Sequence, residues 1–256
     1  MRGNILRNLL VAAAFAIRSA PAQPAPAFEV ASVKASQNSP TGKEGPQESI
    51  DPQPATLTMR NTTLRSCIRW AYSLKDYQVV GPEWVASARY DIVAKSAGPV
   101  ATADLRRMLQ ALLSDRFQLT VHRDTKELPV YALVVGKSGP KLQAAAGDGK
   151  ATLNISSDAR LAFRNTSMAE LADRLSVRPF GLDHPVLDKT GLSGSYDFTL
   201  KFADSIMELK QSLARESQEP GTYASALADL GLKLEGQRGP VELLVVDHAE
   251  KAPTEN

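Results

Sequence analysis

The sequence predicts an α+β fold, built as a tandem duplication of a β-α-β-β-α-β-β unit with small mixed sheets. Three pairs of matching stretches lead to this prediction. LTMRNTTL begins at residue 57 and LAFRNTSM at 161, YDI at 90 and YDF at 196, and PVYALVV at 129 and PVELLVV at 240. The offsets, 104 (161 minus 57), 106 (196 minus 90) and 111 (240 minus 129), grow along the chain, as insertions in loops would make them. A chance likeness of two β-α segments is the alternative, and the shared order of elements argues against it.

The first unit contains two helical segments and several strand-like ones. In both helical segments apolar residues recur at i, i+3, i+4, i+7 and i+8, which gives one apolar face. These residues are Leu64, Cys67, Ile68, Ala71 and Tyr72, then Leu105, Met108, Leu109, Leu112 and Leu113. We expect Thr63 and Thr102 to be the N-caps. Strands are expected at 57–60, 77–81, 89–96, 117–124 and 130–135, with Leu128 and Pro129 separating the last two, and one further strand precedes the unit at 28–34.

The second unit repeats this order. Its helix faces consist of Met168, Leu171, Ala172 and Leu175, with Ser167 as the cap, and of Tyr223, Ala226, Leu227 and Leu230. Strands are expected at 161–164, 184–191, 195–202, 232–236 and 240–246. Because Cys67 matches Leu171 (67 plus 104), its position serves apolar volume, and we expect a buried, inert thiol.

Both copies contain an Arg-Asn pair, Arg60-Asn61 and Arg164-Asn165. Asparagine tolerates unusual backbone angles and bonds to nearby backbone amides, so a structural turn is the favoured interpretation. A function shared by the two copies is the alternative.

Changes in composition divide the chain further. Residues 36–56 are rich in proline and read as a loop, and 136–150 are rich in Gly, Lys and Ala. The expected segments are a signal peptide (1–22), an N-terminal strand and loop (23–56), the first repeat (57–135), a linker (136–154), the second repeat (155–247) and a tail (248–256). A polar insertion at 203–220 is either a solvated helix or a mobile loop.

The first residues are typical of a secretory signal peptide. Arg2 and Arg7 form a basic region, residues 9–17 an apolar one, and Ala20-Pro21-Ala22 a cleavage site, with Ala27 as the second choice. An uncleaved anchor is the alternative, but these nine apolar residues are fewer than the roughly 20 that cross a bilayer. We therefore expect export to the periplasm or the exterior, and no membrane span after the signal is removed.

Composition indicates a globular protein without an affinity for nucleic acid. The chain is 43% hydrophobic and 23% charged, which allows a substantial core. Removing residues 1–22 takes away three arginines and no acid, leaving 27 basic residues (30 minus 3) against 28 acidic ones. Such a balance excludes the basic surface that nucleic acid requires. Cys67 is the single cysteine, so no intrachain disulfide can form.

Several longer strings resemble a known family. FEVASVK, RWAY, GPEW, LLSDRFQLTVHRDTKELPVYALVV, LDKTGLSGSYDFTL and PVELLVVDH are similar to the uncharacterised "soil-associated protein" family of exported acidobacterial proteins. The resemblance covers residues 28–253 and implies a domain of unknown function, with no catalytic residues to carry over. Some members carry the domain beyond a membrane-bound sensor metallopeptidase, which implies sensing or binding. The element order and the L-x-[MF]-R-N-T-[ST] pattern also resemble the short N-terminal modules of secretins and TonB-dependent receptors, at the level of fold.

The residues predict no catalytic, metal or cofactor site. His122, His184 and His248 lack the spacing of a zinc site. No G-x-S-x-G motif marks a nucleophilic serine, and the glycines of TGLSG (190–194) precede a strand and so indicate a tight turn.

The aromatic residues are the best candidates for a binding site. Trp70, Tyr72, Tyr77, Trp84 and Tyr90 lie within 21 residues of the first unit and include both tryptophans. Trp70, Tyr77, Trp84 and Tyr90 could line a groove for a ligand, because aromatic rings offer a large contact area with few rotors. The alternative is a locally aromatic core, to which Tyr72 is assigned.

Two functions remain open at this point. The first is an exported, non-catalytic binding or interaction module of the bacterial cell envelope, whose partner is a protein, a peptide or an envelope ligand. The second is a secreted hydrolase whose site assembles around His122 or His184. Convergence of His184, Asp188 and a further polar side chain in one pocket would favour the hydrolase.

Overall fold

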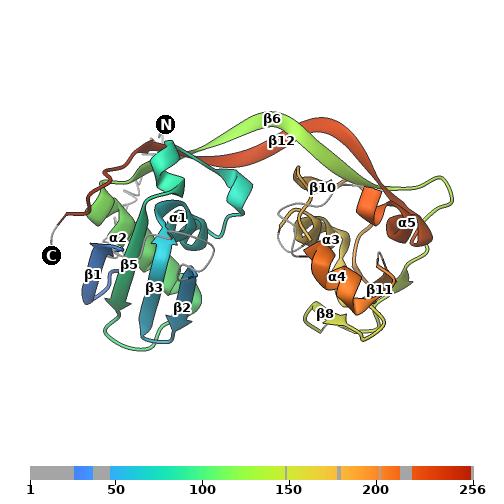
Figure 1. Ribbon diagram of the computed structural model, residues 1–256, viewed down its shortest axis with the longest axis horizontal. Coiled ribbons are helices and arrows are strands. Elements are labelled where there is room, and N and C mark those ends of the chain that lie inside the picture. Colours follow the sequence, from blue (N-terminus) through green and yellow to red (C-terminus); the bar gives the residue numbers. More distant parts are fainter. Residues whose placement is uncertain are drawn as a thin grey trace, which may run out of the picture.

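The computed structural model describes residues 26–36, 47–147, 149–177, 180–201, 203–213 and 221–254. The predicted signal peptide lies outside these residues. Two lobes stand side by side and are joined by a long two-stranded ribbon (Figure 1). Helices and small sheets occur in both lobes, which confirms the predicted α+β class.

The first lobe is a four-stranded antiparallel sheet packed with two helices. The strands are β1 (Val30–Ala35), β2 (Ser49–Gln53), β3 (Thr56–Thr63) and β5 (Arg89–Lys95), and the helices are α1 (Leu64–Tyr72) and α2 (Thr102–Phe117). The order across the sheet is β1-β5-β3-β2. The predicted apolar faces of both helices are buried, except for the half-buried Tyr72. The 3.6-residue periodicity therefore identified the core side of each helix.

The second lobe has the same plan. Its strands are β7 (Gln143–Ala144), β8 (Thr152–Ile155), β9 (Leu161–Ser167) and β11 (Ser195–Leu200), and its helices are α3 (Met168–Leu175), α4 (Ile206–Leu213) and α5 (Gly221–Asp229). The order β7-β11-β9-β8 matches that of the first lobe strand by strand. This match is what a duplication would produce, and the duplication itself stays a prediction.

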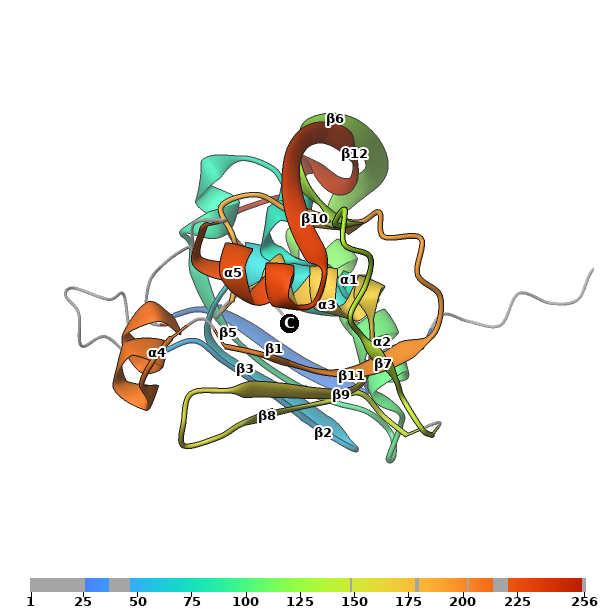
Figure 2. The ribbon, with the colours of Figure 1, turned by 90° about the vertical axis from the view of Figure 1, so that its right-hand side faces the viewer.

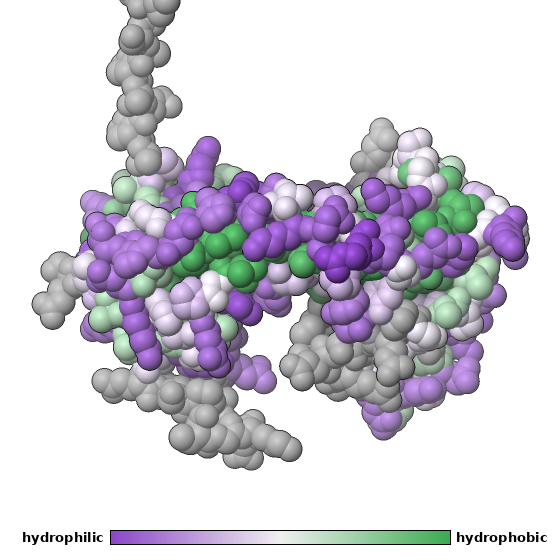
Figure 3. Space-filling model, turned by 90° about the horizontal axis from the view of Figure 1, so that it is seen from above, coloured by the Kyte–Doolittle hydropathy of each residue, from purple (hydrophilic) through white to green (hydrophobic). Residues whose placement is uncertain are grey.

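The ribbon is formed by β6 (Thr120–Val135) and β12 (Leu232–His248), which pair antiparallel over nearly their whole length. Short strands extend it on either side: β10 (Val186–Asp188) runs parallel to β6, and β4 (Val79–Val80) parallel to β12. Viewed along the row of lobes, the sheets lie on the lower side, the helices above them and the ribbon on top (Figure 2). From above, hydrophilic side chains cover much of the ribbon (Figure 3).

The ribbon strands cross between the lobes. β6 leaves α2 in the first lobe and ends in the second, where Leu133 is fully buried in the core. β12 leaves α5 in the second lobe and ends in the first, where Leu244 and Val246 are buried. Each core is thus completed by a strand from the other half of the chain. The lobes consequently do not follow the predicted boundaries of 57–135 and 155–247.

The prediction of two strands on either side of each ribbon proline was wrong. Segments 117–124 and 130–135 belong largely to one strand, β6, and 232–236 and 240–246 belong to another, β12. Pro129 and Pro240 lie inside these strands. They are tolerated because, among the described residues, only two strands pair at the centre of the ribbon. Each strand therefore has an open edge, where the missing N–H of proline breaks no ladder hydrogen bond.

The repeated Arg-Asn-Thr stretch forms a bulge in each lobe. Asn61 and Asn165 have positive φ angles of 52° and 48°. The backbone N–H of Asn61 donates to Asp91 Oδ1 at 2.7 Å, and that of Asn165 donates to Asp197 Oδ1 at 2.9 Å. The two repeated motifs, Arg-Asn-Thr and Tyr-Asp, therefore form one structural feature. The asparagine adopts the left-handed region, and the aspartate of the neighbouring strand accepts a hydrogen bond from its backbone N–H. This geometry supports the structural interpretation of the repeat.

Two of the three predicted caps are confirmed. Thr63 accepts from the N–H of Ser66, and Ser167 forms a capping box with Glu170. The third was wrong, because Ala101 is the N-cap of α2 and Thr102 is its first helical residue. The carbonyl of Ala101 accepts from Asp104 and Leu105, so the helix begins one residue earlier than the side chains indicate.

Two segments expected to be irregular carry regular structure, and the polar insertion follows the helical one of its two predicted alternatives. The 36–56 loop contains β2, an edge strand that tolerates Pro52, and the 136–154 linker contains β7 and most of β8. The polar insertion contains α4, whose Leu209 is 1% exposed, so this helix packs on the core of the second lobe. At 77–81 only Val79 and Val80 form a strand, because a 3-10 helix, η1 (Asp76–Gln78), comes first. None of the helices in the described ranges is both long and apolar enough to cross a membrane.

Candidate functional site

A small third core lies where the two lobes meet the ribbon. It consists of the buried ribbon residues Val130, Val241 and Leu243, with Tyr77 from η1 of the first lobe and Leu187 from β10 of the second packed against it. The packing is close: a Cβ added at Gly239 would lie 3.0 Å from Leu187 Cδ1. This core therefore brings a residue of each lobe into close packing with the centre of the ribbon.

A pocket of about 360 Å³ opens beside this core, and we call it the junction pocket. Asp76 and Tyr77 line it from the first lobe, and residues 176–177 and 181–185 line it from the second. Both halves of the chain therefore build its wall. Of the residues singled out from the sequence, it brings together Tyr77, a predicted ligand-binding ring, and His184, the centre of the alternative hydrolase site.

Tyr77 and His184 occupy matching places in the two halves. Tyr77 stands two residues before β4, and His184 stands two residues before β10. Because β4 and β10 flank opposite sides of the same ribbon, the segments that precede them approach each other at the centre of the molecule.

Charged groups surround the junction pocket, and most of them are paired. Lys75 binds Asp173 across the two lobes, and Arg69 lies 3.2 Å from Asp76. Asp183 instead accepts a hydrogen bond from the Tyr131 hydroxyl at 3.0 Å. Burial raises the pKa of the Tyr77 phenol above 10.0, and the negative charge of Asp173 acts in the same direction. The tyrosine is therefore neutral at pH 7, and Asp183 is the carboxylate of the pocket wall that has no arginine or lysine partner among the described residues.

The hydroxyl of Ser176, the serine of the pocket, is hydrogen-bonded to the protein backbone. Ser176 Oγ donates to the carbonyl of Ala172 and accepts from the N–H of Val186, both at 2.8 Å. Its hydroxyl therefore joins α3 to β10. His184 directs Nδ1 toward the carbonyl of Asp183 at 2.9 Å, and its ring stacks on Tyr131 at 5.7 Å. Nucleophilic catalysis requires a hydroxyl bonded to the base, and Ser176 and His184 do not form such a pair.

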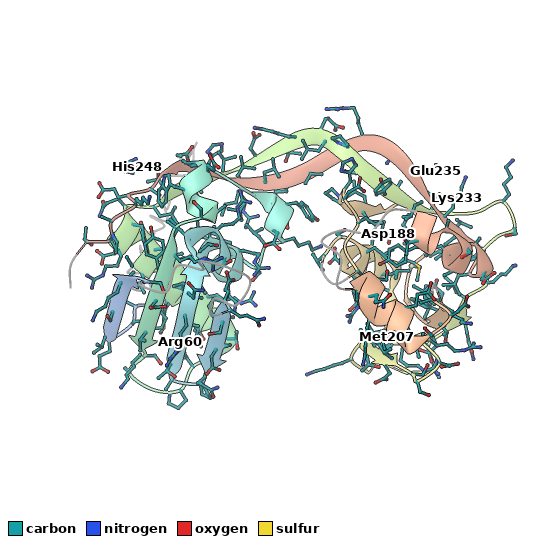
Figure 4. All side chains as sticks on the ribbon, in the orientation of Figure 1. Arg60, Asp188, Met207, Lys233, Glu235 and His248 are labelled. Carbon is teal, nitrogen blue, oxygen red and sulfur yellow. The ribbon has the colours of Figure 1, made fainter. Side chains whose placement is uncertain are left out.

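The other histidines lie elsewhere. His122 Nδ1 contacts Asp247 at 2.7 Å on the part of the ribbon that belongs to the first lobe. Asp188 is in the second lobe and His248 at the far end of the first (Figure 4). The Asp188 carboxylate accepts from the N–H and the hydroxyl of Thr190 and does not line the junction pocket. Across the described residues, no group of three or more His, Cys, Asp or Glu is placed to hold a metal ion.

The four predicted aromatic residues do not share one groove. Tyr77 lines the junction pocket, whereas Trp84 packs, half-buried, against the core of the first lobe. Tyr90 is 1% exposed, stacks edge-on against Phe117 and donates its hydroxyl to the carbonyl of Lys251. Tyr90 therefore packs mainly in the core of the first lobe, and it also borders a separate pocket of about 320 Å³ with Arg89 and Lys251.

Trp70 lines a second, shallower pocket with Arg69, Ser73, Leu74 and Arg106. The Arg106 guanidinium lies 5.3 Å from the centre of the indole ring and donates to the hydroxyl of Ser73. Ser73 is the C-cap of α1, where cations stabilise the helix end. Both arginines of this pocket are thus engaged within the protein, Arg69 with Asp76 and Arg106 with Ser73 and Trp70. For this reason the junction pocket is the stronger candidate for a binding site.

Comparison with known proteins places the chain in a family. The family described as "Protein of unknown function (DUF3738)" matches residues 65–249, which run from α1 to the end of β12. The chain belongs to this family. No curated protein and no solved structure matches it. The DUF3738 region contains every residue of the junction pocket.

Sequence reasoning missed Asp76 and Asp183 as site residues. Each lies just before a two- or three-residue strand, and such short strands give little periodic signal. A usable signal was the repeat itself, since it places Tyr77 and His184 at matching distances before β4 and β10. What it could not show is that these segments meet, because the crossing of β6 and β12 brings them together.

Proposed function

We propose that the protein is an exported, non-catalytic binding module of the bacterial cell envelope, and that the junction pocket is its binding site. The observation that carries the proposal is the composition of this pocket: its wall comes from both lobes and combines the Tyr77 ring with the polar side chains of Asp76, Asp183 and His184. Binding sites are typically concave, partly aromatic and set between domains, with a few polar groups that fix orientation. Binding is favoured over hydrolysis because the Ser176 hydroxyl is hydrogen-bonded to the backbone of Ala172 and Val186 and not to His184.

The pocket is also preorganised. The third core holds Tyr77 and the second lobe in place, and Tyr131 orients Asp183 and stacks on His184. A ligand that enters such a pocket loses little affinity to ordering of the protein. Export rests on residues 1–22, and amino-terminal sequencing of the mature protein should find cleavage after Ala22.

The test is to block the pocket. His184→Trp adds bulk at its mouth, and His122→Trp makes the same change on the ribbon of the first lobe, where the side chain is similarly exposed (53% against 43%). The full mature chain, immobilised and exposed to envelope extract, should capture a partner with the wild type and with His122→Trp. His184→Trp should lose it while keeping the thermal unfolding midpoint of the wild type.

Equal capture by both variants would overturn the proposal. A hydrolase makes a different prediction: the extract would show a cleaved product that disappears with His184→Ala or His122→Ala.

A further inference from the structure

Asp183 is the one carboxylate of the junction pocket without a strong cationic partner. Asp76 is paired with Arg69. Within the described ranges, no lysine or arginine lies within ion-pair distance of Asp183, and only the His184 ring comes near, with Nε2 at 4.0 Å. The Asp183 side chain is 49% exposed, so its carboxylate faces the open pocket.

Asp183 is nevertheless held in one orientation. Oδ1 accepts from the Tyr131 hydroxyl at 3.0 Å, and the Tyr131 ring is fixed in turn by stacking on His184 with an angle of 26° between the planes. This contact engages one oxygen and leaves acceptor capacity on the carboxylate. Hydrogen bonds from ionised donors to a carboxylate are about twice as strong as neutral ones, so a cation is the best partner for this group.

The rest of the pocket fits the stem of such a cation. Tyr77, Val177, Leu182 and Pro185 supply apolar wall area around the polar groups. Lysine and arginine side chains pack their aliphatic stems on apolar surface and keep the charged head at a polar group. A volume of about 360 Å³ is roughly ten times the ~30 Å³ share of one liquid water, so a whole side chain can enter.

We propose that the junction pocket binds an ammonium or guanidinium group on an aliphatic stem, carried by a polypeptide as a lysine or arginine side chain, with Asp183 as its counter-ion. Tyr77 contributes a ring face beside the stem, where it also attracts a cation. This inference rests on the proposed function and specifies its ligand.

The experiment is an NMR titration of the full, isotope-labelled mature chain with short capped peptides. The peptides carry lysine, arginine, norleucine or glutamate at one central position, and the diamine cadaverine distinguishes a free amine from a polypeptide. The lysine and arginine peptides should shift the amide signals of Tyr77 and of residues 181–185, at least tenfold more tightly than norleucine or glutamate. Asp183→Asn should weaken this binding at least tenfold.

Asp247→Asn is the matched control, because Asp247 also contacts a histidine and is similarly exposed (46%). It should bind the lysine peptide as the wild type does. Tighter binding of cadaverine than of the lysine peptide would overturn the assignment to a polypeptide. Equal binding of norleucine and lysine, or unchanged binding by Asp183→Asn, would overturn the cation site. If His184→Trp still abolished capture from extract, the pocket would remain a binding site for a different ligand.

Discussion

The Arg-Asn-Thr bulges of the two lobes share a backbone and differ in their surroundings. In the second lobe, Arg164 lies 3.7 Å from Asp197, and the Asn165 amide donates to the carbonyl of Gly149. In the first lobe, the matching surface borders a pocket of about 330 Å³, and among the described residues Arg60 has no acidic partner within ion-pair distance. The bond from asparagine N–H to aspartate is present in both. The two bulges thus have the same backbone geometry, while the side chains around them differ.

The same contrast applies to the lobes as wholes. Their sheets have the same strand order, but only the ribbon crossing decides which half of the chain completes which core. Position in the sequence therefore does not decide position in space: Leu133 belongs to the first unit but packs in the core of the second lobe, and Leu244 belongs to the second unit but packs in the core of the first.

The largest expected effect tests this crossing. Leu133→Ala and Leu244→Ala each remove a buried side chain, 0% and 2% exposed, and each should lower the free energy of unfolding by about 2–5 kcal/mol. Hydrogen exchange should then accelerate chiefly in the second lobe for Leu133→Ala and in the first for Leu244→Ala. Val93→Ala, at a 45% exposed position, is the control and should change stability by less than about 0.5 kcal/mol. Acceleration confined to the opposite lobe in each case would show that the strands do not cross.

A smaller effect tests the shared bulge. Asp91→Ala and Asp197→Ala each leave an asparagine N–H without its charged acceptor, so each should cost about 1.5–3 kcal/mol in urea unfolding. Similar losses in both lobes would show that one device is used twice. Asp51→Ala, on the exposed edge strand β2, is the control and should stay close to the wild type. If only one of the two bulge variants were destabilised, the common role of the motif would be refuted.

The sequence allowed the helices and most sheet strands to be predicted, because their apolar periodicity reflects burial on one face. α1, α3 and the buried faces of α2 and α5 follow from this signal. The ribbon escaped prediction, since Pro129 and Pro240 usually mark breaks and only an open edge makes them harmless. The junction pocket escaped it for a different reason. Tyr77 and Asp183 meet only because β6 and β12 exchange lobes, and no local pattern records that exchange.

Closeness in the sequence did not predict that the aromatic side chains would share one site. Trp70, Tyr77, Trp84 and Tyr90 are close in sequence, but they lie on four different elements or turns and point to different surroundings. Tyr90 alternates with outward residues of β5 and so falls on the buried face, which the period of two could have indicated.

The smallest expected effect is at Cys67, which is compared with Leu171, its match in the second lobe. Both are fully buried, and burial raises the pKa of the Cys67 thiol from 9.0 to about 12, so at neutral pH it is a protonated, apolar group. Cys67→Ala should therefore cost about 1–2 kcal/mol and Leu171→Ala, which removes a larger side chain, about 2–5 kcal/mol in urea unfolding.

The pH dependence separates the two positions further. The unfolded thiol ionises near pH 9, while the folded one keeps its proton to about pH 12, so the stability contributed by Cys67 is complete below pH 9 and falls as the pH rises through this interval. Cys67→Ala should lessen that alkaline loss, and Leu171→Ala should not change it. A thiol reagent should label Cys67 only after denaturant is added. The thiolate is the reactive form, and in the folded protein the Cys67 thiol is protonated and buried away from the reagent. Rapid labelling of the native protein, or loss of lysine-peptide binding without loss of stability, would place this cysteine at a functional site and break its equivalence with Leu171.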